Sequence, residues 1–157
     1  MSERPHIMVV EARYYEDLSE ELLRGATKAL EAGGATFERF AVPGALEIPA
    51  AVRFAAESAG SLAQRRRFDG YVALGCVIRG ETTHYDHVCE ESWRGLQDLA
   101  LKYMLAIGNG ILTVENEEQA WERARVDRKN NGGWAANACL KMIAKWTALQ
   151  DKSEALA

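Results

Sequence analysis

Cysteine is scarce in this sequence, and its spacing does not suit a disulfide scaffold or a metal site. The three cysteines, Cys76, Cys89 and Cys139, are odd in number and form no C-x-x-C pair, which argues against a disulfide framework or a zinc knuckle. Histidine is equally sparse. His84 and His87 lie three residues apart, but no third ligand stands at a suitable spacing, so we expect no metal.

Long apolar runs and an excess of positive charge are also missing. No run approaches the roughly 18 apolar residues of a membrane-spanning helix, and the first residues lack the charged and then apolar pattern of a signal peptide. The formal net charge is −4, which offers no basic surface to nucleic acid. We therefore expect a cytoplasmic protein that binds neither membrane nor nucleic acid.

Short apolar segments alternate with segments of helical periodicity along the chain. Residues 18–30 carry apolar side chains every three or four positions and are followed by Gly33-Gly34, a common helix end. Gly70–Leu74 is apolar without alternation, which is typical of a parallel strand covered on both faces. The expected strands are 7–10, 36–42, 70–74 and 110–114, and the expected helices are 18–30, about 46–57, 84–105, 117–125 and 133–149.

This order, βαβαβαβαα, predicts a single α/β domain over residues 1–157. Strand–helix–strand units form right-handed crossovers, which build a parallel sheet with helices on both faces. We therefore expect a three-layer, flavodoxin-like sandwich with a four-stranded parallel sheet. Four strands make a small sheet for a free-standing α/β domain, so we expect neighbouring subunits to cover part of its surface.

Three segments that follow predicted strands carry the chemically useful side chains. Ligands of open parallel sheets bind beyond the carboxyl ends of the strands, and those ends lead here into Glu11–Tyr14, Val42–Glu47 and Gly75–His84. Together the segments supply an aromatic ring, carboxylates, a glycine-flanked loop, hydroxyls and a histidine. We expect the ligand site at this edge of the sheet.

The last of these segments ends where a long helix begins. Free backbone amides at Gly80–Thr83 and the positive end of the helix dipole favour a bound anion there. For the hydroxyl of Thr82 or Thr83, the alternative is a helix N-cap alone. His84 opens the helix beside this site, where a side chain that titrates near neutral pH suits proton transfer; the alternative is a structural histidine.

Cys76 lies in the same segment and has two interpretations. A cysteine close to a histidine in a pocket is a candidate nucleophile. A small buried thiol at the end of a strand is the commoner situation, and we favour it.

Several motifs resemble those of one enzyme family, the lumazine synthases. Pro43–Pro49 reads PGALEIP and resembles their VPGA-x-E-IP segment, and Leu74–Asp86 reads LGCVIRGETTHYD and resembles their LG-x-VIRG-x-T-x-H-[YF]-D segment. Gly110–Asn116 and Glu118–Ala124 resemble a third family block. The matches run in order from the first strand to the last helix.

The resemblance implies an enzyme of riboflavin biosynthesis that uses two small-molecule substrates and no cofactor. One substrate is 5-amino-6-(D-ribitylamino)uracil and the other is 3,4-dihydroxy-2-butanone 4-phosphate, and the product is 6,7-dimethyl-8-ribityllumazine. The matching positions imply a proton-transfer role for His84 and phosphate contacts from Glu81, Thr82 and Arg123. The residues implied to bind the pyrimidine and its ribityl chain are Tyr14, Ala45, Leu46, Glu47, Cys76, Val77, Ile78 and Asn109.

The resemblance also implies a homo-oligomer with active sites at subunit interfaces. Residues 125–131 lack the Gly-x-Lys-x-Gly-Asn pattern of members that build icosahedral shells, so we expect a pentamer or stacked pentamers. Asn109 stands where many members have Phe, just before the fourth predicted strand, and so at the opposite end of the sheet from the pocket. The alternatives are a non-catalytic flavin or lumazine binder and a shell protein; the residues for phosphate argue against both.

Overall fold

A four-stranded parallel sheet with the strand order β2-β1-β3-β4 forms the centre of the molecule. The computed structural model describes residues 4–58 and 66–156, with side chains through residue 151. The strands are β1 (His6–Ala12), β2 (Thr36–Val42), β3 (Gly70–Ile78) and β4 (Ile107–Val114). The helices are α1 (Glu16–Ala32), the 3₁₀ turn η1 (Ala45–Glu47), α2 (Ile48–Ser58), α4 (His84–Tyr103), α5 (Glu117–Ala124) and α6 (Asn131–Leu156).

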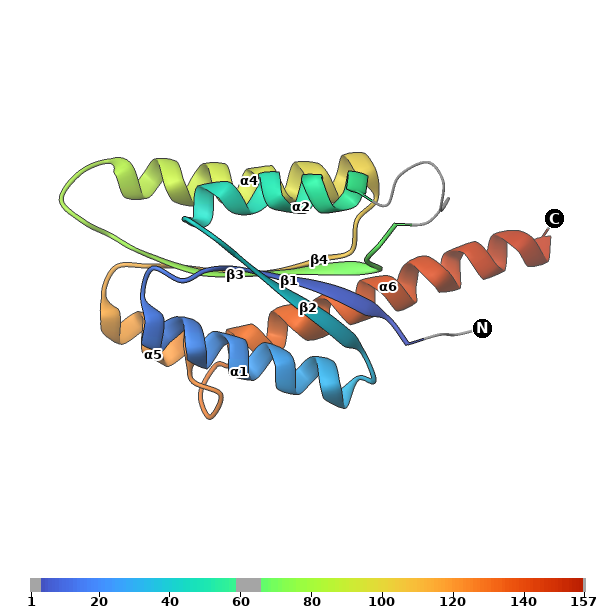
Figure 1. The fold of residues 1–157 in the computed structure, drawn as a ribbon, viewed down its shortest axis with the longest axis horizontal. Helices are drawn as coiled ribbons and strands as arrows, with labels where there is room; N and C mark the ends of the chain where they lie inside the picture. The colour runs from blue at the N-terminus through green and yellow to red at the C-terminus, as the bar shows by residue number, and fades with distance from the viewer. Residues whose placement is uncertain (1–3, 59–65, 157) are drawn as a thin grey trace.

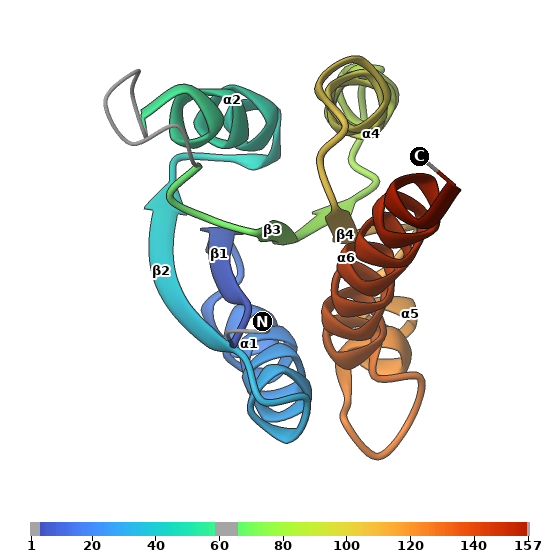
Figure 2. The ribbon, with the colours of Figure 1, turned by 90° about the vertical axis from the view of Figure 1, so that its right-hand side faces the viewer.

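The helices cover both faces of the sheet. Figures 1 and 2 show α2 and α4 on one face and α1, α5 and α6 on the other, with the last turns of α6 extending beyond the sheet. The expected three-layer, flavodoxin-like α/β fold is confirmed. Among the described residues, no helix combines the length and the apolar character that a membrane span requires.

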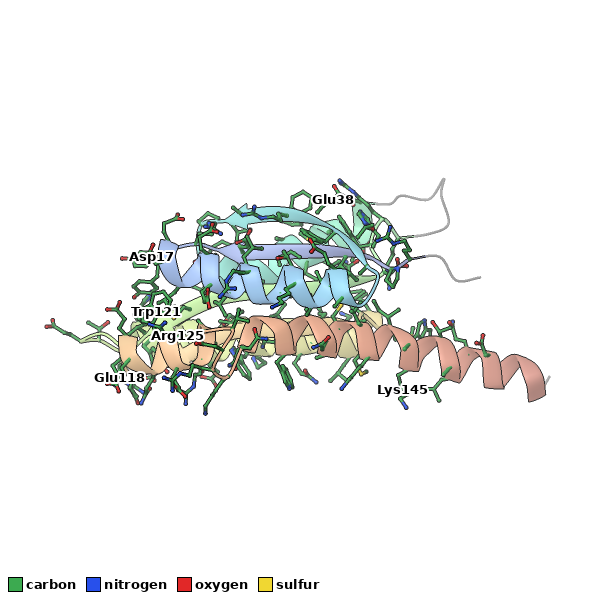
Figure 3. All side chains as sticks on the ribbon, turned by 90° about the horizontal axis from the view of Figure 1, so that it is seen from below. Asp17, Glu38, Glu118, Trp121, Arg125 and Lys145 are labelled. Carbon is green, nitrogen blue, oxygen red and sulfur yellow. The ribbon has the colours of Figure 1, made fainter. Side chains whose placement is uncertain are left out.

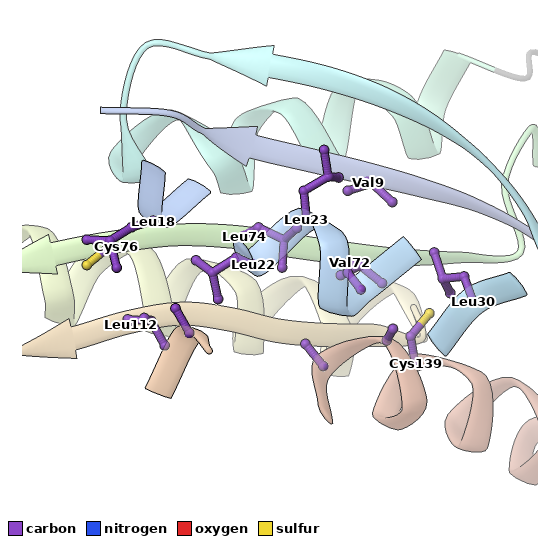
Figure 4. Packing of buried hydrophobic residues seen from close by; sticks show 14 of the residues in the cluster. Val9, Leu18, Leu22, Leu23, Leu30, Val72, Leu74, Cys76, Leu112 and Cys139 are labelled. Carbon is purple, nitrogen blue, oxygen red and sulfur yellow. The ribbon is translucent and has the colours of Figure 1, made fainter. Parts of the chain in front are cut away.

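Strand β3 contributes to the hydrophobic cores on both sides of the sheet. Val72, Leu74 and Cys76 pack toward α1, α5 and α6, in the cluster that Figure 4 shows. Tyr71 and Ala73 pack toward α2 and α4 on the other face. Because successive residues of a strand point to opposite faces, a strand buried on both sides has to be apolar throughout, which explains its unbroken apolar sequence.

Helix boundaries agree with the predicted signals at one end of the chain and differ at the other. Helix α1 ends at the predicted glycine pair, and Gly34 adopts a φ of 77°. Helix α6 begins at Asn131, before the expected Gly133. Gly132 lies inside this helix because it packs closely on α1: a Cβ at this position would meet the carbonyl oxygen of Leu22 at 2.1 Å.

Three strands are longer than the sequence predicts, and β1 spans His6–Ala12 instead of residues 7–10. β3 continues to Ile78 instead of ending at Leu74, and β4 begins at Ile107 instead of Gly110. The expectation that Asn109 precedes the fourth strand is therefore wrong, because it lies within β4, where it pairs with Ala73. Its Oδ1 accepts a hydrogen bond from the Ile111 amide at 3.0 Å. This local bond lets a polar side chain occupy a strand position.

The helices differ in what they expose, according to how close they lie to the edge strand β4. Charged side chains such as Asp17, Glu118 and Arg125 stand on α1, on α5 and just after α5 (Figure 3), and they are exposed. Helices α4 and α6 and the residue after α4, which flank the edge strand β4, expose large apolar side chains as well as charged ones. The apolar ones are Trp93, Leu101, Met104, Trp134, Met142, Trp146 and Leu149.

Candidate active site

The topology of the sheet creates a crevice at the carboxyl ends of β1 and β3. From β1 the chain crosses first to β2 on one side and then to β3 on the other. Ligands of open α/β sheets bind at such a switch point, because the loops that leave the two central strands diverge. A cavity of about 380 Å³ lies here. Its lining residues are Ala12, Tyr14, Tyr15, Gly44, Ala45, Leu46, Glu47, Cys76, Val77, Ile78, His84 and Val88.

The cavity brings together eight of the residues that the sequence predicts for the site. They come from three separate segments and are Tyr14, Ala45, Leu46, Glu47, Cys76, Val77, Ile78 and His84. Of the other lining residues, Ala12 and Gly44 lie within segments that the sequence predicts for the site, whereas sequence reasoning missed Tyr15 and Val88. The helical spacing of His84 and Val88, four residues apart, was a signal for the last of these.

The end of β3 offers unpaired backbone groups to the cavity. Pairing with β1 stops at Glu11 and Leu74, whereas pairing with β4 continues to Ile78 and Val114. Residues 75–78 therefore have a strand partner on one side only. Buried peptide groups need hydrogen-bond partners, and those on the β1 side are available to a planar ligand with donors and acceptors along its edge.

Two tyrosines form an aromatic wall of the cavity. The rings of Tyr14 and Tyr15 meet edge to face, with their centroids 4.9 Å apart. Tyr14 is 78% exposed, so its ring is open to a stacking ligand. Tyr15 is half-buried, and burial raises the pKa of its phenol, which keeps the hydroxyl protonated at neutral pH.

Cys76 contributes a buried, protonated thiol. Only 9% of the residue is exposed, and burial raises the pKa of the thiol to about 12. Cysteine reacts as the thiolate, and this pKa leaves almost none of it at neutral pH. The environment of Cys76 therefore supports the interpretation as a buried thiol over that as a nucleophile.

The loop before α4 has free amides at the positive end of the helix. The Thr82 hydroxyl accepts a hydrogen bond from the His84 amide at 3.3 Å, which resembles capping, whereas the N-cap residue Thr83 makes no side-chain cap bond. Within the described residues, the amides of Thr82 and Thr83 donate to no protein acceptor. An anion at this point would accept hydrogen bonds from these amides and lie at the positive end of the dipole of a 20-residue helix.

Arg79 holds the start of this loop in place. Its amide donates to the Val114 carbonyl at 3.0 Å, and its guanidinium donates to Glu115 at 2.5 Å and to Asp86 at 3.4 Å. The bond to Glu115 raises the pKa of Arg79. These contacts connect the ends of β3 and β4 with the first turn of α4, so that the anion loop and His84 have a fixed relation to each other.

Two predicted site residues do not reach this cavity within one chain. Arg123 lies on α5, across the sheet from α4, and its Nη1 donates to the Gln119 carbonyl at 3.1 Å. Asn109 lines a different groove beside the edge strand β4, between Trp93 of α4 and Trp134 of α6. The two other predicted residues, Glu81 and Thr82, are exposed in the loop next to the cavity.

No cluster for a metal ion is found. Among residues 4–58 and 66–151, no three or more His, Cys, Asp or Glu side chains are grouped in a way that could hold one. The groups that line the cavity or lie beside it are of the kinds suited to stacking, backbone recognition, anion binding and, at His84, proton transfer.

This fold and this cavity define a flavodoxin-like α/β protein with a cavity at the switch point of its sheet. The family model for 6,7-dimethyl-8-ribityllumazine synthase matches residues 4–146. A 6,7-dimethyl-8-ribityllumazine synthase of Bartonella tribocorum is 58% identical over 144 residues, which cover 92% of this chain and 91% of that protein. One of Agrobacterium fabrum is 56% identical over 140 residues, covering 89% and 93%.

The chain belongs to the 6,7-dimethyl-8-ribityllumazine synthase family. A further relative, named 6,7-dimethyl-8-ribityllumazine synthase 1, from Rhizobium meliloti, is 56% identical over 138 residues, or 88% of this chain and 89% of that protein. The chain is accordingly an enzyme of the transferase class, and its substrates are small molecules.

Proposed function

We propose that the switch-point cavity condenses 5-amino-6-(D-ribitylamino)uracil with 3,4-dihydroxy-2-butanone 4-phosphate to give 6,7-dimethyl-8-ribityllumazine. The observation that carries the proposal is the convergence of eight predicted site residues on one cavity beside the start of α4. These residues come from three segments that are far apart in the sequence. The family to which the chain belongs makes the same product by name.

The pyrimidine binds between an aromatic ring and the end of β3. Tyr14 stacks on its face, and the unpaired peptide groups of Cys76, Val77 and Ile78 bond to its edge. A uracil ring presents alternating donors and acceptors along that edge, which matches a strand backbone. Ala45, Leu46 and Glu47 lie across the cavity and hold the ribityl chain, with the Glu47 carboxylate accepting hydrogen bonds from its hydroxyls.

The phosphate of the second substrate binds at the start of α4. The amides of Thr82 and Thr83 donate to it, with Glu81 in the same loop. The helix dipole adds a favourable interaction of about 0.3–1 kcal/mol with a negative charge. This position brings the butanone carbons next to His84, which lines the cavity one turn before Val88.

The reaction needs positioning and proton transfer only. The 5-amino nitrogen attacks the ketone, and one water leaves to give an imine. Loss of a proton from carbon expels phosphate and forms an enol, which becomes a ketone; the ribitylamino nitrogen attacks this carbonyl, and a second water leaves. His84 moves protons in these steps, and fixing the two reactants together contributes up to several kcal/mol.

A second copy of the chain completes the site in a homo-oligomer, a pentamer or stacked pentamers. Arg123 and Asn109 lie outside their own chain's cavity. In this assembly they contribute to the cavity of a neighbouring chain, where the Arg123 guanidinium fork binds phosphate. A groove of about 620 Å³ beside β4, between Trp93 and Trp134, supplies apolar surface for that contact. A second groove of about 710 Å³, lined in part by Tyr71 and Trp146, adds to it. Exposed apolar patches of this kind are typical of interfaces.

The direct test is to mix the purified protein with both substrates and record the absorbance and green fluorescence of the lumazine product. We expect product to form faster than in a matched mixture without protein. Binding of lumazine or riboflavin without any such acceleration would contradict the proposal and favour a non-catalytic binder instead.

A further inference from the structure

A charged residue is buried in β1, next to the cavity, and the proposed reaction does not use it. Glu11 is 2% exposed in a strand that is otherwise apolar from Ile7 to Ala12. A buried carboxylate is costly unless it is paired. Its Oε1 accepts a hydrogen bond from Arg13 Nη1 at 2.5 Å, and its Oε2 accepts one from Arg39 Nε at 3.1 Å.

Arg13 extends this pair from the strand to the following helix. Besides Glu11, it donates to Glu16 at 3.1 Å and to Glu20, both on α1. Its side chain is only 18% exposed, although it lies in a loop, and these carboxylates raise the pKa of the guanidinium. One arginine therefore joins the end of β1 to the first two turns of α1.

The residue after Arg13 is the aromatic ring of the cavity. Tyr14 is 78% exposed, so packing against the rest of the chain does little to fix its ring. The N-cap residue of α1, Tyr15, makes no side-chain cap bond, so capping does not fix the loop backbone either. At the far end of the loop, Tyr15 packs against the core cluster under α1 and its carbonyl accepts the Ser19 amide at 2.8 Å. On the strand side of Tyr14, the Glu11–Arg13 pair restrains the backbone.

We propose that Glu11 and Arg13 are positioning residues that set the place of Tyr14 and thereby the affinity for the pyrimidine substrate. This inference rests on the proposed function, because it assigns the stacking role to Tyr14. Arg13 itself does not line the cavity, whereas its two neighbours in sequence, Ala12 and Tyr14, do. Its effect on binding passes through Tyr14 and leaves proton transfer by His84 unchanged.

Arg39 supplies a matched control for the test. Arg13→Met and Arg39→Met each remove one of the two guanidinium groups bound to Glu11, and both keep an unbranched side chain of similar length. Only Arg13 connects Glu11 with the loop that carries Tyr14. Any general loss of stability from weakening the buried ion pair should therefore occur in both variants. A change in the position of Tyr14 should occur only in Arg13→Met.

We expect Arg13→Met to raise the KM for the pyrimidine by about tenfold, a loss within the range of one aromatic stacking contact. The kcat and the KM for the butanone phosphate should stay within about twofold of the parent enzyme. Arg39→Met should leave all of these values within about twofold. Arg13→Lys, which keeps a cation beside Glu11, should recover part of the pyrimidine affinity.

A double-mutant cycle decides whether Arg13 acts through Tyr14. The readout is the dissociation constant of 6,7-dimethyl-8-ribityllumazine, followed by its fluorescence in folded variants checked by thermal melting. We expect Arg13→Met to weaken binding about tenfold in the parent and less than about twofold in Tyr14→Ala. Equal weakening in both backgrounds, or equal weakening by Arg39→Met, would overturn the inference.

The failure of the proposed function gives a different result. A parent enzyme that makes no lumazine from the two substrates contradicts the function itself. A parent enzyme that makes lumazine, with a Tyr14→Ala variant that binds it normally, leaves the function intact and overturns this inference alone.

Discussion

At the scale of single residues, turnover should depend most on His84. It is the one histidine in the cavity lining, whereas His87, one turn further along α4, is exposed outside it. We expect His84→Ala to lower kcat by about tenfold to a hundredfold, near the lower end of general acid–base effects, because imine chemistry proceeds partly unaided. The KM values should change less than kcat.

His87→Ala is the matched control, because it removes the same side chain from the same helix without touching the cavity. Its kcat should remain within about twofold of the parent. The measurement is the pH profile of kcat from pH 5 to 8 for all three proteins. Identical profiles and rates for the parent and His84→Ala would remove this histidine from the mechanism.

Cys76 should be dispensable for covalent chemistry. Burial raises the pKa of its thiol to about 12, above the ordinary value, so the thiol is almost fully protonated at neutral pH and gains thiolate only as the pH approaches that value. We expect Cys76→Ala to keep most of its activity. Complete loss in a folded, assembled variant would revive the nucleophile interpretation.

A chemical experiment tests the same point without changing Cys76. Cys89 is half-buried, whereas Cys76 and Cys139 are buried, and burial also raises the pKa of Cys139 to about 12. In a Cys89→Ser variant at pH 8, we therefore expect iodoacetamide to leave activity nearly unchanged. Rapid inactivation of that variant would indicate a reactive thiolate in the cavity.

At the scale of elements, the start of α4 should act as a phosphate site. Free amides and the dipole of this helix favour an anion, so inorganic phosphate should inhibit competitively against the butanone phosphate. It should not compete with the pyrimidine, whose site lies at the end of β3. Initial rates at several concentrations of each substrate separate the two patterns, with KCl at equal ionic strength as the control. Competition with the pyrimidine would mean that the anion site lies elsewhere.

The elements also explain which parts of the site could be predicted from the sequence. Tyr14, Glu47, Cys76 and His84 follow the ends of the predicted strands, although Cys76 lies within β3 in the structure. Parallel strands bring their carboxyl ends to one edge, so alternating strands and helices were enough to group these residues. The overhang of β3 past Leu74 was not predictable, because it depends on where β1 stops pairing.

Long-range contacts were the other part that sequence patterns did not provide. The approach of Gly132 to the Leu22 carbonyl places this glycine within α6, although a Gly-Gly pair alone favours a loop. The buried pair of Glu11 and Arg13 had a weak signal, a carboxylate inside an apolar strand with an arginine two residues later. Nothing in the sequence indicated that Arg39, on another strand, completes it.

At the scale of the whole molecule, the separation of Arg123 from His84 predicts an active site shared between chains. Asn109 pairs with Ala73, and Cys76, which lines the cavity, lies three positions further along β3. About 10 Å of strand therefore lies between Asn109 and the level of Cys76. Arg123 lies on the opposite face of the sheet from α4. A ring of subunits supplies such head-to-tail contacts, whereas a twofold dimer does not require them.

Two inactive variants should therefore restore each other. We expect His84→Ala and Arg123→Ala each to have low activity alone, and to regain activity when they are unfolded, mixed in equal amounts and reassembled. In a randomly mixed ring, each interface takes an intact His84 from one chain with a probability of one half and an intact Arg123 from its neighbour with the same probability. Roughly a quarter of the interfaces should then be complete and active.

Each variant refolded alone is the control for recovery, and native mass spectrometry of the mixture establishes co-assembly. In the mixture, every chain lacks either His84 or Arg123. Mixed rings that stay as inactive as the separate variants would therefore mean that each chain needs both residues of its own for a complete site.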